Sequence, residues 1–168
     1  NHEKPSTCRN EYMTKSIDVT LFGATGFVGR LTAEYLANHA PQGATIALAG
    51  RNQSKLEKVR SEIAQDSGVE TVREWPIIVA DSFDAPSLHN LAEQSTAVIS
   101  TVGPYTRYGE ELVRACAEAG THYVDLCGEV LFMHRTISKF HSTAEKSGAR
   151  IVHACGFDSV PSDIGMLM

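Results

Sequence analysis

The segment Gly23-Ala24-Thr25-Gly26-Phe27-Val28-Gly29 decides the fold, because it joins an apolar strand-like run, Ile17–Phe22, to the start of a helical pattern. Its glycines have the spacing GxxGxxG. Gly23 allows a tight turn, Gly26 lets the backbone approach a pyrophosphate, and Gly29 lets the helix pack against the sheet. Amide groups at the start of the helix then face the phosphates. The segment predicts a dinucleotide-binding loop; the alternative is a structural turn whose glycines are incidental.

Apolar strand-like runs alternate with helical patterns along the rest of the chain. Most runs are nearly continuous in apolar or small residues, which is typical of parallel strands covered on both faces. Such alternation indicates βαβ units with right-handed crossovers. We therefore expect an α/β fold of the Rossmann type, a doubly wound, mostly parallel sheet of about six strands in the order 3-2-1-4-5-6. The runs are Ile17–Phe22, Thr45–Ala49, Pro76–Ala80, Ala97–Val102, His122–Leu126 and Arg150–Ala154.

The helical patterns between these runs each place apolar residues on one face, which we expect to pack on the sheet. Gly120 and Gly148 follow two of the patterns as C-caps, and Pro86 suits the first turn of another. The three clearest stripes are Val28, Leu31, Tyr35 and Leu36; Leu112, Val113, Cys116 and Ala117; and Met133, Ile137, Phe140 and Ala144.

The second run leads into Arg51, at a position where many NAD-binding domains carry an acidic residue for the ribose 2′-hydroxyl. A carboxylate repels a 2′-phosphate, whereas a guanidinium binds it through charge-assisted hydrogen bonds and can stack on adenine. Such bonds contribute about 1.5–3 kcal/mol each. Arg51 therefore favours NADP(H) over NAD(H); the alternative is a solvated arginine at the start of a helix.

Further candidates follow the third and fourth runs, at the sheet edge where ligands bind in such folds. Asp81 can accept a hydrogen bond from adenine or cap the next turn. Gly103 permits close approach to the cofactor, and Pro104 stiffens the loop. The residues assigned to the cofactor are Gly23, Thr25, Gly26, Phe27, Val28, Gly29, Arg51, Asn52, Lys55, Asp81, Gly103 and Pro104.

Tyr105, Asp125 and Glu129 are the candidates for the reacting centre. Either carboxylate can position substrate or transfer a proton, or can instead cap the helix that begins near Val130; Tyr105 can instead pack within its loop. The sequence has no Tyr-x-x-x-Lys pair, no GxSxG elbow and no GxxxxGK[ST] loop. The histidines show no convincing metal-ligand spacing, so no metal site is expected.

The composition predicts one domain with the make-up of an ordinary globular protein: 168 residues, 42% hydrophobic and 21% charged. A net charge of −5 argues against a general nucleic-acid binder. The four cysteines form no CxxC pair, and no apolar run is long enough to span a bilayer. We therefore expect reduced thiols and a cytoplasmic domain, while membrane association of a full-length protein stays open.

Three parts are expected along the chain. Residues 1–15 lack a hydrophobic period and are expected to be a disordered tail or a segment foreign to the native protein. Residues 16–160 are expected to form the NADP-binding Rossmann domain. Residues 161–168 look like the truncated start of a missing C-terminal substrate domain.

From about Ser16 onward the chain resembles the saccharopine dehydrogenase-like oxidoreductases, and within them the actinobacterial trans-acting enoyl reductases. The resemblance implies an NADP-binding domain followed by a larger C-terminal α/β region. It also implies reduction of a carbon–carbon double bond on a polyketide-derived lipid precursor, with a polyketide synthase or a second copy of the chain as partner. The motifs that carry it are Gly23 to Gly29; Ala49-Gly50-Arg51; Val102-Gly103-Pro104-Tyr105 with Tyr108-Gly109; Asp125-Leu126-Cys127-Gly128-Glu129; and Cys155-Gly156-Phe157-Asp158-Ser159-Val160-Pro161-Ser162-Asp163.

Three functions are compatible with these features. The leading hypothesis is hydride transfer from NADPH to an activated alkene, in which the protein orients the reactants and the nicotinamide supplies the chemistry. A second is oxidation or reduction at a C–N bond, as in saccharopine metabolism. A third is a non-catalytic protein that senses NADP(H), which the missing Tyr/Lys pair permits. In each case we expect the isolated chain to bind cofactor without turnover.

Overall fold

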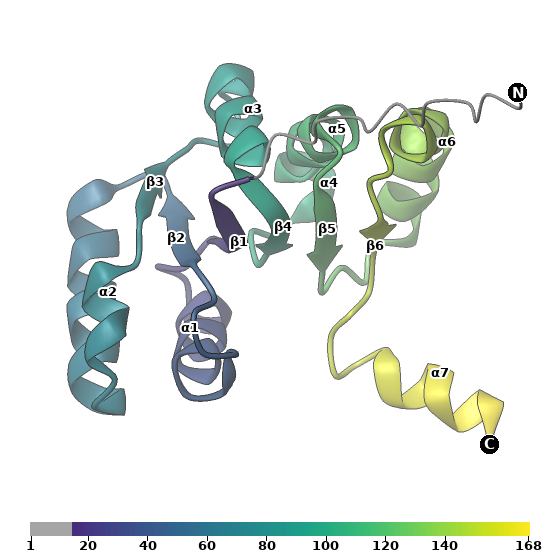
Figure 1. The fold of residues 1–168 in the computed structure, drawn as a ribbon. Helices are drawn as coiled ribbons and strands as arrows, with labels where there is room; N and C mark the ends of the chain where they lie inside the picture. Colours follow the sequence, from purple (N-terminus) through teal and green to yellow (C-terminus); the bar gives the residue numbers. More distant parts are fainter. Residues whose placement is uncertain (1–14) are drawn as a thin grey trace, which may run out of the picture.

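Every strand pairing in the computed structural model is parallel, and the six strands follow the order β3-β2-β1-β4-β5-β6 (Figure 1). The structure describes residues 15–168. The expected Rossmann-type fold and strand order are confirmed. The strands are β1 (Ile17–Phe22), β2 (Ile46–Gly50), β3 (Ile77–Val79), β4 (Ser95–Ser100), β5 (His122–Asp125) and β6 (Ile151–Val152).

Helices lie on both sides of this sheet (Figure 1). Two separate apolar clusters result, one under α3, α5 and α6 and the other under α1 and α2. The helices are α1 (Phe27–His39), α2 (Gln53–Ser67), α3 (Ala85–Gln94), α4 (Tyr105–Tyr108), α5 (Glu110–Ala119), α6 (Val130–Ser147) and α7 (Val160–Leu167), with a 3-10 turn, η1 (Glu70–Glu74), before β3.

The helix ends follow their sequence signals. Gly120 and Gly148 take left-handed conformations at the ends of α5 and α6, with φ of 66° and 81°. Pro86 lies in the first turn of α3. The apolar stripe of α5 is buried as expected, including Cys116 and Leu112.

Of the stripe expected to bury α1, only Leu36 packs against the cluster under α1 and α2, and the rest of the expectation is wrong. Val28, Leu31 and Tyr35 are 40%, 49% and 62% exposed, whereas Gly29 and Ala33 are the buried residues of this helix. Small side chains face the sheet because α1 approaches the glycine loop too closely for larger ones. Apolar periodicity alone therefore selected the wrong face of α1.

The last strand is shorter than expected. The run Arg150–Ala154 contributes only Ile151–Val152 to β6, because the backbone turns away at Ala154, which has a φ of 59°. At the other end, the described chain begins at Lys15, the last residue of the expected tail; residues 1–14 of that tail lie outside the described part. The ammonium of Lys15 donates to the carbonyl of Ala119 at 3.0 Å and to the hydroxyl of Thr121. Between residues 15 and 168 no helix is both long and apolar enough to cross a bilayer.

Candidate nucleotide-binding site

The glycine loop fills the space between β1, α1 and β4 so closely that two of its glycines have steric reasons to be there. Gly23 has a φ of 95°, and a Cβ on it would lie 2.7 Å from side-chain atoms of Thr101 and Val102. A Cβ on Gly29 would overlap the carbonyl oxygen of Gly23. The loop and the first turn of α1 therefore fit only with hydrogen at both positions.

Gly26 is different, because its Cβ would meet only the carbonyl oxygen of Gly23, at an ordinary 3.4 Å. This residue is exposed, and it precedes α1 without any side-chain cap. Gly23, Thr25 and Gly26 line a hollow of about 200 Å³. The hollow at an uncapped helix start has the character expected of a diphosphate cradle.

Arg51 borders the same hollow from the end of β2. It is exposed, as is Lys55 in the first turn of α2. Asn52 caps α2 through its side-chain oxygen, which accepts the Lys55 amide at 2.9 Å. The structure therefore places Arg51 beside the hollow at the start of α1, while the side chain of Asn52 is occupied at the start of α2.

A second hollow of about 260 Å³ continues from Arg51 toward β3 and the loop after β4. Phe83 and Tyr108 line it and meet edge to face, with ring centroids 5.4 Å apart. Asp81 also lines it, and its carboxylate accepts the Phe83 amide at 2.9 Å, so the turn-capping alternative is realised. These aromatic walls, which the sequence did not single out as a pair, suit an adenine ring.

The loop after β4 carries Gly103 and Pro104, which are both exposed and joined by a cis peptide bond. Gly103 lines both hollows. Tyr105 instead turns into the core, where its hydroxyl donates to the carbonyl of Ser100 at 2.9 Å. Burial raises the pKa of the Tyr105 phenol well above its usual range. Tyr105 therefore anchors the loop after β4 in the core.

Glu129 lies in the loop after β5 and binds the loop after β4. Its two oxygens accept the amides of Tyr105 and Thr106 at 2.6 and 2.8 Å. The hydrogen bonds from Thr106, followed by that from Tyr105, lower the pKa of the Glu129 carboxyl. Glu129 caps α4, not the helix α6 that follows it in sequence, and so ties the loops after β4 and β5 together.

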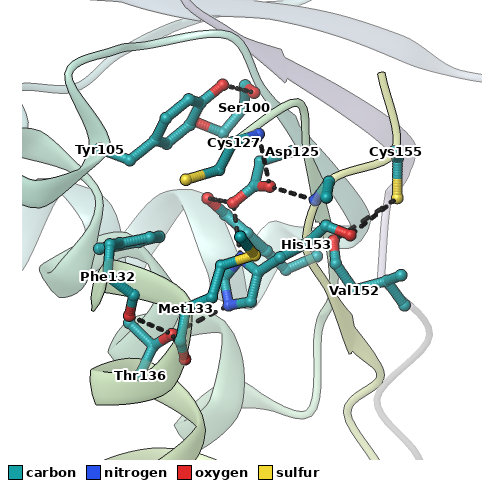
Figure 2. A network of polar contacts seen from close by, with 12 residues as sticks. Ser100, Tyr105, Asp125, Cys127, Phe132, Met133, Thr136, Val152, His153 and Cys155 are labelled. Atoms are coloured by element: carbon teal, nitrogen blue, oxygen red, sulfur yellow. Dashed lines mark hydrogen bonds and ion pairs between the residues drawn. The ribbon is translucent and has the colours of Figure 1, made fainter. Parts of the chain in front are cut away.

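Asp125 is the centre of a buried polar network (Figure 2). One carboxylate oxygen accepts the hydroxyl of Tyr123 at 2.9 Å and lies 2.7 Å from Nδ1 of His153. The other accepts the amides of Cys127 and Ala154, both at 3.0 Å. Burial opposes ionisation, but the hydrogen bonds from His153 and the two amides outweigh it and lower the pKa of the Asp125 carboxyl.

His153 is the partner that sequence reasoning missed. Its Nε2 lies 2.9 Å from the hydroxyl of Thr136 on α6, and its side chain is only 6% exposed (Figure 2). Asp125 and His153 stand 28 positions apart at the ends of adjacent strands. The pairing of β5 with β6 brings the two side chains together. The signal available in the sequence was an Asp near the end of an apolar run.

All three candidates for the reacting centre are thus engaged with the protein itself. Tyr105 holds a carbonyl, and Asp125 and Glu129 hold backbone amides in the loops after β4, β5 and β6. No group of three or more potential metal ligands occurs in the described part of the chain. These residues shape the carboxyl edge of the sheet. Besides the two hollows beside Arg51, a larger one of about 630 Å³ borders this edge and is lined by Thr101, Asp125 and Phe157.

The strand order, the glycine loop and the hollows that meet at Arg51 define a Rossmann-type dinucleotide-binding domain. Residues 19–152 match the family model of the saccharopine dehydrogenase NADP-binding domain. The chain belongs to this family, and its cofactor is NADP(H).

The curated relatives include mycobacterial proteins of one name. A provisionally named trans-acting enoyl reductase of Mycobacterium tuberculosis is 51% identical over 152 residues, which is 90% of this chain and 35% of that protein. The trans-acting enoyl reductases of Mycobacterium bovis and Mycobacterium leprae are 47% identical over the same shares of both chains. The chain therefore spans about a third of the length of the relatives it matches.

Solved structures agree on the fold. Yeast saccharopine dehydrogenase (L-Glu forming) superimposes with a TM-score of 0.64 at 22% identity, over 84% of this chain and 28% of that one. A reductase/Diels-Alderase from Malbranchea aurantiaca gives 0.61 at 16% identity, over 83% and 72% of the two chains. At these identities the likeness concerns the fold alone.

Proposed function

We propose that the chain is the cofactor-binding part of an NADPH-dependent trans-acting enoyl reductase. The proposed reaction adds a hydride and a proton across the carbon–carbon double bond of a polyketide-derived enoyl substrate, and NADPH is oxidised to NADP⁺. A separate polyketide synthase would build that substrate. We place the reaction in the cytoplasm, where free thiols such as those of Cys116 and Cys127 stay reduced.

The observation that carries the proposal is the exposed guanidinium of Arg51 beside the Gly26 cradle, in a chain about half identical to proteins of that name. Gly23 and Gly26 would hold the diphosphate at the start of α1, and Arg51 would bind the 2′-phosphate. When bound, NADPH would supply the hydride. This chain's own residues would orient the cofactor, since Tyr105, Asp125 and Glu129 are committed to the loops.

The cofactor assignment is tested by titrating NADPH and NADH into the chain and following cofactor fluorescence. NADPH should bind at least about tenfold more tightly, because the guanidinium makes charge-assisted hydrogen bonds to the 2′-phosphate alone. Arg51→Ala should remove most of this difference and leave NADH affinity nearly unchanged.

Arg73→Ala is the matched control, because Arg73 is also an exposed arginine but pairs with Glu70 on η1. It should leave both affinities unchanged. Equal affinities of the unsubstituted chain for NADPH and NADH would refute the assignment of Arg51.

The reaction itself is tested with the full-length protein and an enoyl thioester. Oxidation of NADPH with formation of one saturated thioester per cofactor supports the proposal. Turnover only with substrates that form or break a C–N bond would favour the saccharopine-type reaction. Tight NADPH binding with no turnover of either substrate would favour a sensing role.

A further inference from the structure

One face of the sheet is covered along only half of its width. Helices α1 and α2 cover β1, β2 and β3 on this face, while α3, α5 and α6 cover the other face (Figure 1). On the half without a helix, Ile99 of β4 and Val124 of β5 are only half-buried, and Val152 of β6 is 49% exposed. Their sequence neighbours Val98 and Tyr123 point the opposite way and are fully buried.

One side of α1 borders the same area. Val28 and Thr32 line a hollow of about 630 Å³ together with Ile99 and Val124. We call Val28, Thr32, Ile99, Val124 and Val152 the open face. None of these five residues is charged, although a sheet face that meets water normally alternates polar with apolar side chains.

The apolar character of both faces of β4, β5 and β6 has an explanation in this way. Strands that are apolar on both faces are typical of a sheet covered by a layer on each side. Contiguous apolar area is stabilised when it is removed from water. The composition of the open face is thus that of a surface buried in a protein core.

We propose that the open face is the docking surface for the polypeptide that follows residue 168 in the full-length protein. The curated relatives are much longer than the matched region, which makes up 35% of their length. The last helix, α7, leaves β6 on the same side of the sheet as α1 and buries none of its own residues (Figure 1). The chain is therefore already directed to the side that lacks a layer.

The occupant is an amphipathic helix that presents an uncharged, apolar side. The backbone groups of β4 and β5 are paired within the sheet on both sides, so the open face offers side-chain packing and no strand addition. A helix there completes the second layer and closes the hollow that ends at Cys155 and Phe157. This inference rests on the proposed function only in taking the full-length protein to resemble the enoyl reductases in length.

Thiol labelling of the full-length protein tests the inference. Thr32→Cys and Val152→Cys place single thiols on the open face, in a background where Cys8 and Cys155 are replaced by serine. Lys58→Cys is the control, since the Lys58 side chain is 77% exposed on α2, away from this face. Peptide mass spectrometry reads the alkylation rate at each position separately.

The thiols at positions 32 and 152 should react at least about tenfold more slowly than the control thiol, at every protein concentration and with or without NADPH. Rates equal to the control would overturn the inference. Protection that grows with protein concentration would assign the face to a second copy, and protection only with NADPH would assign it to the cofactor; both contradict the proposal. Failure of the NADPH titration would leave these rates unaffected, so the two proposals fail separately.

Discussion

Asp125→Asn keeps the shape of the side chain but removes the charge that faces His153 and two backbone amides. The carboxamide oxygen can still accept the two amides, but its NH2 group then faces His153 and Tyr123, so the hydrogen bonds to both must reverse direction. We expect a loss of about 3 kcal/mol in the free energy of unfolding near neutral pH, since hydrogen bonds to a buried charge are lost. Urea titration measures it.

The effect of this substitution should depend on pH in a defined direction. The pKa of the Asp125 carboxyl is lowered in the folded protein, so its stabilisation is present above the unfolded value of about 3.9 and is lost as the pH falls through the folded value. The difference between the unsubstituted protein and Asp125→Asn should therefore shrink below about pH 4. A constant difference from neutral to acidic pH would contradict the assignment of the stabilising charge to Asp125.

Tyr105→Phe separates anchoring from catalysis. The phenol donates to the carbonyl of Ser100 inside the core, so its loss should cost about 1 kcal/mol of stability. The full-length protein should keep its turnover number for an enoyl substrate and show the same pH profile. A drop of about a hundredfold in turnover, without a matching loss of stability, would restore Tyr105 as a proton donor.

At the scale of elements, the contact of α1 with the glycine loop leaves no room for a methyl group. Gly29→Ala should push α1 from the loop and weaken NADPH binding by about tenfold or more, because a small shift of the amides at the helix start spoils their geometry. Gly165→Ala is the matched control, since Gly165 is also helical and a Cβ added to it would meet nothing within 4 Å. Normal affinity in Gly29→Ala would show that the loop tolerates the displacement.

The elements also show where sequence reasoning succeeds and where it stops. The strand runs and their order follow from local pattern, because parallel strands at the centre of a fold are apolar throughout. The buried side of α1 does not follow, since it depends on Gly29 and Ala33 fitting against a loop. The Arg51 position is readable because it follows β2 directly. The hydrogen bonds of Asp125 and Glu129 cannot be predicted from the sequence, because their partners come from other loops.

On the scale of the whole molecule, the strand order reverses between β1 and β4, which pair along five register positions. The hollow between Gly26 and Arg51 lies across this reversal point. Gly23 and Gly26 line it from the β1 side, and Thr101 and Gly103 line it from the β4 side. A ligand bound there contacts both halves of the fold. NADPH at a hundred times its dissociation constant should therefore stabilise the chain by about 2.7 kcal/mol, measured as a rise in Tm, and Arg51→Ala should reduce the rise.

The reversal at β1 and β4 also divides the polypeptide into two mononucleotide-sized lobes that are joined covalently only through the segment around α3. A dinucleotide that spans both lobes contacts each of them and holds them together while it is bound. Breathing motions across this seam, observable as amide hydrogen exchange in β1 and β4, therefore report directly on the occupancy of the crevice.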